Sequence, residues 1–171
     1  RPRRGMKTAG EQTERLVRVP ADGVTLEGAL EIPPGATGLV LFAHGSGSSR
    51  FSPRNNFVAQ EMRRAGLATL LIDLLTRDED RDYQTRFDIP LLTQRVVAVT
   101  QWLATQADTD TLALGLFGAS TGAAAALQAA TALPETVTAV VSRGGRPDLA
   151  GGQALARVHA PTLLIVGGHD D

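Results

Sequence analysis

The hydrophobic residues of this chain are gathered in short continuous runs, and the segments between them are polar or rich in glycine. Two β-prone runs, at 16–19 and 24–32, flank Ala21-Asp22-Gly23, and Asp-Gly between such runs is a strong signal for a hairpin. Further runs typical of strands buried on both faces lie at 39–43, 67–74, 111–117, 136–142 and 162–166. Segments that favour helix separate these runs, so the order after the hairpin is βαβαβαβαβ. This alternation predicts an α/β fold with a doubly wound, mostly parallel sheet, an N-terminal antiparallel hairpin and helices on both faces.

Two of the connecting segments carry clear helix signals. Ser52 and Pro53 are typical of an N-cap followed by the first helical residue. The helix that they begin is expected to place four apolar residues on one face, namely Phe57, Val58, Met62 and Ala65. After Pro90 a second apolar stripe recurs at helical spacing, at Leu92, Val96, Val99 and Leu103.

The segment 76–88 is polar and is predicted to be a loop. Aspartates alternate within it as in a calcium-binding loop, at positions 78, 80 and 82. Tyr83 and Ile89, however, stand where such a loop requires glycine and glutamate. We therefore predict a solvated acidic loop and no metal site.

Composition narrows the classes of function. The 171 residues carry a formal net charge of −1 and are 43% hydrophobic, which gives no bias toward nucleic acid or an anionic membrane. No apolar run approaches the ~18–20 residues of a membrane span. The chain has no cysteine and hence no disulfide or cysteine nucleophile, and with no signal-peptide segment in view a cytoplasmic location is expected. Basic residues gather at the start, so 1–14 is expected to be a tail or linker ahead of one domain, 15–171.

Gly118-Ala119-Ser120-Thr121-Gly122 is the motif that says most about chemistry. It follows the predicted strand 111–117 and precedes the alanine-rich run 123–130, which favours helix. G-x-S-x-G between a strand and a helix is the arrangement of a nucleophile elbow, a sharp turn that strains the serine backbone and exposes its hydroxyl. Ser120 is therefore the candidate nucleophile, and the backbone N–H of Thr121 is a candidate donor to an oxyanion.

A second oxyanion donor is expected from the loop after the strand 39–43, which reads His44-Gly45-Ser46-Gly47. Its glycines allow backbone N–H groups to converge on an anion. The N–H of Ser46 is the first choice and that of Gly47 the second. A flexible turn that binds nothing is the alternative reading of the loop. If the strands are parallel, their carboxyl ends bring this loop and Ser120 to the same edge of the sheet.

Together these motifs resemble the α/β-hydrolase superfamily, with His-Gly after the third strand, G-x-S-x-G after a later strand and Gly-Gly-x-Asp after the last one. Three phrases are similar to the serine branch of dienelactone-hydrolase-like proteins, at 118–127, 142–149 and 161–168. The likeness runs from about residue 15 to the C-terminus. The namesakes of that family use a cysteine where this chain has Ser120, which favours a general carboxyl-ester hydrolase over a dienelactone hydrolase. Relatives of this type are often attached to a phosphoribosyltransferase domain.

The resemblance places the acid of a catalytic triad at Asp170, directly after the last strand, with Asp171 and Asp148 as alternatives. The base is expected downstream of the acid, because the order in this fold is Ser, then Asp or Glu, then His. The histidines of the chain are His44, His159 and His169. None is well placed: the first belongs to the oxyanion loop, the second precedes the last strand and the third adjoins the acid. The resemblance thus implies a catalytic histidine in a further C-terminal segment, which leaves the domain incomplete here by a strand and a helix.

The sequence therefore predicts a serine hydrolase that acts on small-molecule carboxylic esters or lactones through an acyl-enzyme and is impaired in this chain for want of its histidine. No metal or organic cofactor is implied, and neither nucleic acid nor membrane is expected as a partner. An uncovered sheet edge predicts self-association. The alternative is a non-catalytic module that binds a ligand or partner, while nucleotide binding is disfavoured because no P-loop is present. Arg143 and Arg146 are candidates for binding a substrate carboxylate, with plain surface charge as the other reading.

Overall fold

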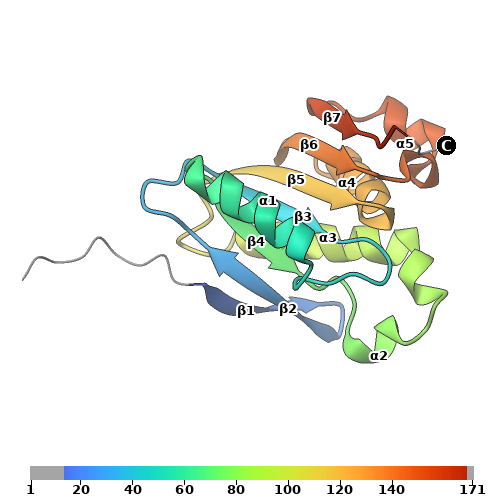
Figure 1. The fold of residues 1–171 in the computed structure, drawn as a ribbon, viewed down its shortest axis with the longest axis horizontal. Coiled ribbons are helices and arrows are strands. Elements are labelled where there is room, and N and C mark those ends of the chain that lie inside the picture. The colour runs from blue at the N-terminus through green and yellow to red at the C-terminus, as the bar shows by residue number, and fades with distance from the viewer. Residues whose placement is uncertain (1–13, 169–171) are drawn as a thin grey trace, which may run out of the picture.

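The computed structural model describes residues 14–168, which build one seven-stranded sheet with helices on both faces (Figure 1). The strands are β1 (Arg15–Ala21), β2 (Val24–Glu31), β3 (Gly38–Ala43), β4 (Ala68–Ile72), β5 (Ala113–Ala119), β6 (Val137–Arg143) and β7 (Thr162–Ile165). The α-helices are α1 (Pro53–Arg64), α2 (Arg77–Asp80), α3 (Ile89–Leu103), α4 (Thr121–Ala132) and α5 (Gly152–Ala156), with 3₁₀ turns η1 (Thr85–Phe87) and η2 (Pro147–Ala150). The predicted α/β fold with its N-terminal hairpin is confirmed.

The hairpin forms where Asp-Gly predicted it. Asp22 and Gly23 both have positive φ, at 41° and 82°, and Ala21 pairs with Val24 across the turn. A two-residue turn with this conformation matches the natural twist of the flanking strands, and asparagine, aspartate and glycine adopt it most readily. The hairpin extends the sheet at one edge, because β2 pairs antiparallel with β4.

The remaining strands run parallel, and the order in which the chain adds them to the sheet changes side at β3. The order is β1-β2-β4-β3-β5-β6-β7, so β4 lies on one side of β3 and β5 on the other. The connection through α1 leads to β4, whereas those through α3 and α4 lead to β5 and β6. Loops that leave β3 and β5 therefore diverge to opposite faces. Such a switch point opens a crevice at the carboxyl ends of the strands, which is where ligands bind in sheets of this kind.

An apolar core lies on each face of the sheet, between the strands and the helices, and successive side chains of β3 point alternately into the two cores. Leu39 and Leu41 point into the larger core, which α3 and α4 cover, and Phe42 points into the smaller core beneath α1. In that smaller core the rings of Phe42 and Phe117 pack with centroids 4.9 Å apart. Figure 1 shows α1 crossing one face of the sheet, with α3 and α4 behind it.

The prediction of which residues form the buried face of α1 is partly wrong. Ser52 caps the helix and Pro53 begins it, as predicted, but the Phe57 side chain is 63% exposed. The helix instead rests on the sheet through Asn55 and Ala59, one turn apart, with Val58 and Met62 at its flank. The buried polar residue Asn55 rotates the contact stripe, and this carries Phe57 to the outside.

The segment 76–88 is more ordered than the predicted loop. Thr76 and Glu79 form a reciprocal capping box that starts α2, and the Arg95 guanidinium donates to both carboxylate oxygens of Glu79 at 3.0 and 2.7 Å. This hydrogen bond from Arg95 holds the pKa of Glu79 below its ordinary value. Asp80 pairs with Arg86 at 3.2 Å. Within residues 14–168 no cluster of acidic, histidine or cysteine side chains is suited to hold a metal ion.

The exposed apolar residues of the edge strand β7 lead to a prediction about self-association. Among residues 14–168 this strand pairs only with β6, and its Leu163 and Leu164 are 57% and 55% exposed although they lie on opposite faces. Uncovered apolar edge strands pair with other chains, so residues 1–171 expressed alone are expected to self-associate in light scattering. Leu164→Lys should lower the average mass, whereas Leu16→Lys at the opposite edge should not. A monomer at micromolar concentration would contradict this expectation.

Candidate active site

The backbone of Ser120 is held in a strained turn between β5 and α4. Its φ is +53° and its ψ is −126°. Within residues 14–168 the only other non-glycine residue with positive φ is Asp22, which lies in the hairpin turn that favours it. Such a conformation costs about 1–3 kcal/mol and persists only where its surroundings enforce it. The N–H groups of Ala123 and Arg146 donate to the Ser120 carbonyl oxygen at 3.0 and 3.3 Å and help to enforce it.

Close packing explains the glycines two residues before and after Ser120. A Cβ atom on Gly118 would lie 2.5 Å from the Cα of Ala123. A Cβ on Gly122 would overlap the Ala43 carbonyl oxygen and lie 2.5 Å from that of His44. The first turn of α4 is therefore pressed against the carboxyl end of β3, and this contact sets the position of Ser120.

The Gly122 contact predicts a large loss of stability for Gly122→Ala. The atoms in the way belong to the main chain and cannot rotate aside, so the free energy of unfolding should fall by about 2–3 kcal/mol, toward the upper end for overpacking. Urea unfolding followed by the fluorescence of the single tryptophan, Trp102, measures this change. Gly152→Ala is the matched control, because a Cβ there meets no atom within 4 Å. Equal stability of the two variants would refute the packing account.

The loop 44–52 lies directly beside Ser120. Ala43 pairs with Gly118 in the β3–β5 register, and a Cβ on Gly45 would lie 2.7 Å from the Cβ of Ser120. Ser46 and Ser120 line the same cleft, which has a volume of about 870 Å³. The structure thus places the first-choice oxyanion residue in the same cleft as Ser120. Gly47, the second choice, has a φ of +71° and is not among the residues that line the cleft.

Thr121 begins α4 and is buried, with 1% of its surface exposed. The first four N–H groups of a helix have no acceptor within it, so the N–H of Thr121 faces outward from the helix end. The dipole of α4 adds a positive partial charge at the same place. The chain therefore has the means to stabilise a negative charge next to Ser120.

The ring of His44 is bonded at both nitrogens. The Leu74 N–H donates to its Nε2 at 3.0 Å, so the proton is on Nδ1, which donates to the Gly45 carbonyl oxygen at 2.9 Å. Neither nitrogen is left to take a proton from Ser120. His44 is therefore a structural link from the loop to the end of β4.

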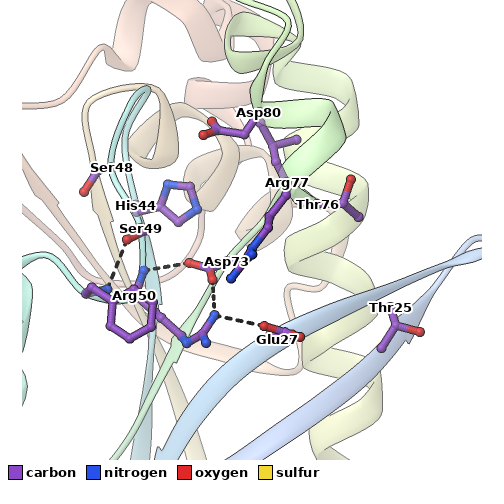
Figure 2. Close-up of a pocket in the computed structure, with 12 residues that line it drawn as sticks. Thr25, Glu27, His44, Ser48, Ser49, Arg50, Asp73, Thr76, Arg77 and Asp80 are labelled. Carbon is purple, nitrogen blue, oxygen red and sulfur yellow. Dashed lines mark hydrogen bonds and ion pairs between the residues drawn. The ribbon is translucent and has the colours of Figure 1, made fainter.

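Arg50 and Asp73 form a second link between this loop and β4 (Figure 2). The N–H of Arg50 donates to Asp73 Oδ1 at 2.7 Å, and its guanidinium pairs with Asp73 Oδ2 and, at 3.4 Å, with Glu27. The Arg50 and Asp73 side chains are only 13% and 20% exposed. They border a hollow of about 300 Å³ that shares Ser48 with the Ser120 cleft. Sequence reasoning missed this pair, although an aspartate that ends an apolar strand was a visible signal.

This link predicts the effect of Asp73→Asn on the loop. Loss of the carboxylate leaves the Arg50 guanidinium without its best acceptor in a largely buried place, so stability should fall by about 1–3 kcal/mol. Amide hydrogen exchange should also accelerate across 44–52. Glu31→Gln is the matched control, because it breaks the similarly buried Arg63–Glu31 pair, 3.0 Å long, on the same sheet and outside the cleft lining. Unchanged exchange in Asp73→Asn, or equal acceleration in Glu31→Gln, would contradict the predicted role.

Arg143 and Arg146 differ in their surroundings. Arg143 lines the Ser120 cleft, is half-buried and donates from Nη2 to Asn55 Oδ1 at 2.8 Å. Arg146 is exposed and forms a two-pronged pair with Asp148, at 3.0 and 2.8 Å. These hydrogen bonds raise the pKa of Arg146 and lower that of Asp148. Asp148 is thus already paired at the surface, which disfavours it as the acid of a triad.

The structure does not place the remaining candidates for the acid and the base at Ser120: they either lie outside residues 14–168 or do not line the cleft. The segment after β7 borders the cleft through Val166 and Gly167. Asp170, Asp171 and His169 lie outside the described residues. His159 is exposed ahead of β7 and does not line the cleft.

Comparison with known proteins places this chain in a family. No family model matches the chain. Among solved structures, a dienelactone hydrolase from Anabaena variabilis is 61% identical, with a TM-score of 0.90 over 94% of this chain and 76% of that one. The chain belongs to the dienelactone hydrolase family. An α/β serine hydrolase from Xanthomonas campestris, 20% identical, shares the fold with a TM-score of 0.69 over 94% of this chain and 74% of its own.

Longer relatives occur in Mycobacterium tuberculosis. Proteins of two strains, provisionally named phosphoribosyl transferases, are 58% identical over 154 residues, which is 90% of this chain. The matched part of this chain covers 34% of the length of those relatives. Of the helices within residues 14–168, α3 is the longest with 15 residues, and none has the length and apolarity that a membrane crossing needs.

Proposed function

We propose that this chain carries the nucleophile and the oxyanion hole of a serine hydrolase for carboxylic esters or lactones. The strained turn at Ser120 is the observation that carries the proposal, because the surrounding main chain holds that serine at the cleft beside Ser46 and Thr121. A strained turn at a cleft is typical of functional residues. The family relationship supports hydrolysis as the reaction class.

The reaction follows from the arrangement of these groups. The Ser120 hydroxyl oxygen attacks the substrate carbonyl carbon while its proton passes to a base, and the carbonyl oxygen becomes an oxyanion. The N–H groups of Ser46 and Thr121 donate to that oxyanion, and such stabilisation is among the largest contributions in this kind of catalysis. Collapse of the tetrahedral intermediate expels the alcohol, which takes the proton from the base. Water then releases the acyl group from Ser120 by the same steps.

The base and its orienting acid complete the proposal. We assign the acid to Asp170, where its carboxylate would accept the Nδ1–H of a histidine that is not among residues 1–171. Residues 1–171 alone are therefore proposed to be impaired. The longer relatives support a whole protein in which this domain adjoins a phosphoribosyltransferase domain.

Covalent labelling of the full-length protein by a fluorophosphonate tests the proposal. We expect one label per chain, on Ser120, and expect Ser120→Ala to abolish labelling and reduce hydrolysis of 4-nitrophenyl butyrate by about 10⁴-fold or more. Ser142→Ala is the control, because that hydroxyl is buried on the neighbouring strand β6 and does not line the cleft. Residues 1–171 alone should turn over the ester far more slowly than the full-length protein. An intact, folded full-length protein that is not labelled would instead favour a non-catalytic binding module.

A further inference from the structure

Arg95 is a charged residue on the buried face of α3. It lies three positions after Leu92 and next to Val96, among the apolar residues of the larger core, and only 4% of its surface is exposed. A charge taken out of water is costly unless partners surround it. The guanidinium of Arg95 pairs with the carboxylate of Glu79, and its Nη1 also donates to the main-chain carbonyl oxygen of Leu74 at 3.1 Å. The second bond connects Arg95 to the main chain just after β4.

Leu74 is held by side chains at both of its main-chain polar groups. It is fully buried and lies beyond Ile72, the last residue of β4 that pairs with a neighbouring strand. Its carbonyl oxygen accepts from Arg95, and its N–H donates to Nε2 of His44 at 3.0 Å. Buried main-chain groups that lose their partners are costly. The two side chains therefore fix the orientation of Leu74 between them.

The other nitrogen of the His44 ring reaches the peptide unit that carries a proposed oxyanion donor. Its Nδ1–H donates to the Gly45 carbonyl oxygen at 2.9 Å, and the Ser48 N–H donates to the same oxygen at 3.2 Å. The N–H of that same peptide unit is the N–H of Ser46. A peptide unit is planar and trans, so its C=O and N–H point in opposite directions. A bond that fixes the Gly45 oxygen thus also fixes the direction of the Ser46 N–H.

Glu79 fixes the far end of this series of hydrogen bonds. Its two carboxylate oxygens accept from Arg95, and Oε2 also accepts from the Thr76 N–H at 2.9 Å in the capping box of α2. The hydrogen bond from Arg95 lowers the pKa of Glu79, so the ion pair is intact at neutral pH and is lost only as the pH falls through that lowered pKa. The guanidinium is therefore held in place on the side away from Leu74.

We infer that Arg95 is a positioning residue for the oxyanion hole. Its guanidinium fixes Leu74, and the Leu74 N–H fixes the ring of His44. The ring in turn orients the peptide unit that joins Gly45 to Ser46. Arg95 does not line the candidate active-site cleft, so it acts only through these hydrogen bonds. Its hold on the peptide unit is independent of catalysis, whereas its effect on the reaction rate rests on the proposed function.

Kinetics of the full-length protein test the effect on rate. Arg95→Met should lower kcat for 4-nitrophenyl butyrate by about 10–100-fold, because a misplaced donor stabilises the oxyanion less well. Acylation and deacylation both pass through an oxyanion, so both steps slow and KM should stay within about twofold. Arg95→Lys should recover part of the rate, because its ammonium can still donate to the Leu74 carbonyl oxygen. Arg63→Met is the matched control: it breaks the similarly buried Arg63–Glu31 pair outside the cleft lining and should leave kcat unchanged.

The position of the proton on His44 tests the hold without catalysis. In full-length protein labelled with [15N]histidine, a long-range 1H–15N spectrum shows which ring nitrogen carries the proton, and the His44 signal is assigned by its loss in His44→Gln. We expect only Nδ1 to be protonated in the wild type and in Arg63→Met. In Arg95→Met we expect a mixture of the two neutral tautomers, because a displaced Leu74 N–H no longer favours an acceptor at Nε2.

Two results would overturn the inference. One is that His44 keeps a single tautomer in Arg95→Met, and the other is that kcat falls no further in Arg95→Met than in Arg63→Met. If Arg95→Met does not fold, Glu79→Gln carries both measurements, because it removes the charged acceptor of Arg95 while glutamine keeps the capping pattern; kcat should then fall several-fold. A tautomer change in a protein that hydrolyses no ester would refute the hydrolase, and with it the effect on rate, but leave the hold of Arg95 on the peptide unit.

Discussion

The site depends on one close contact, that of the first turn of α4 with the carboxyl end of β3. Gly122 lies against the carbonyl groups of Ala43 and His44 with no room for a side chain. Because α4 cannot withdraw without losing this packing, the residue between β5 and α4 must absorb the sharp change in direction. Ser120 is that residue, and its positive φ is the local cost of the contact. The contact also brings the loop after β3 within reach of the serine.

The loop 44–52, which lies beside Ser120, is held in place by its attachments to the end of β4. His44 and Arg50 both attach the loop 44–52 to the end of that strand, one through a neutral ring and the other through an ion pair with Asp73. Electrostatic stabilisation by N–H groups is effective only when their positions are fixed before the charge develops. The two hollows beside the loop therefore differ. The one around Asp73 contains the Arg50–Asp73 pair that holds the loop, and the one around Ser120 contains the candidate nucleophile.

Local signals in the sequence predicted the elements because each has a local cause. Asp22-Gly23 specifies its turn, Ser52-Pro53 the start of α1, and apolar runs the strands buried on both faces. The exposure of Phe57 was not predictable in this way, because it follows from the burial of Asn55, whose amide accepts from Arg143 far along the chain. The Arg50–Asp73 pair likewise joins residues 23 positions apart. The capping box at Thr76 and Glu79 could have been predicted from the spacing of these two residues, but the segment was predicted to be a loop.

A crystal structure of the full-length protein with a phosphonate on Ser120 would test the central claim most directly. We expect Ser120 to keep its positive φ and one phosphonyl oxygen to lie about 2.7–3.1 Å from the backbone nitrogens of Ser46 and Thr121. An oxygen that points away from both nitrogens, or a Ser120 with relaxed helical or extended backbone angles, would contradict the account.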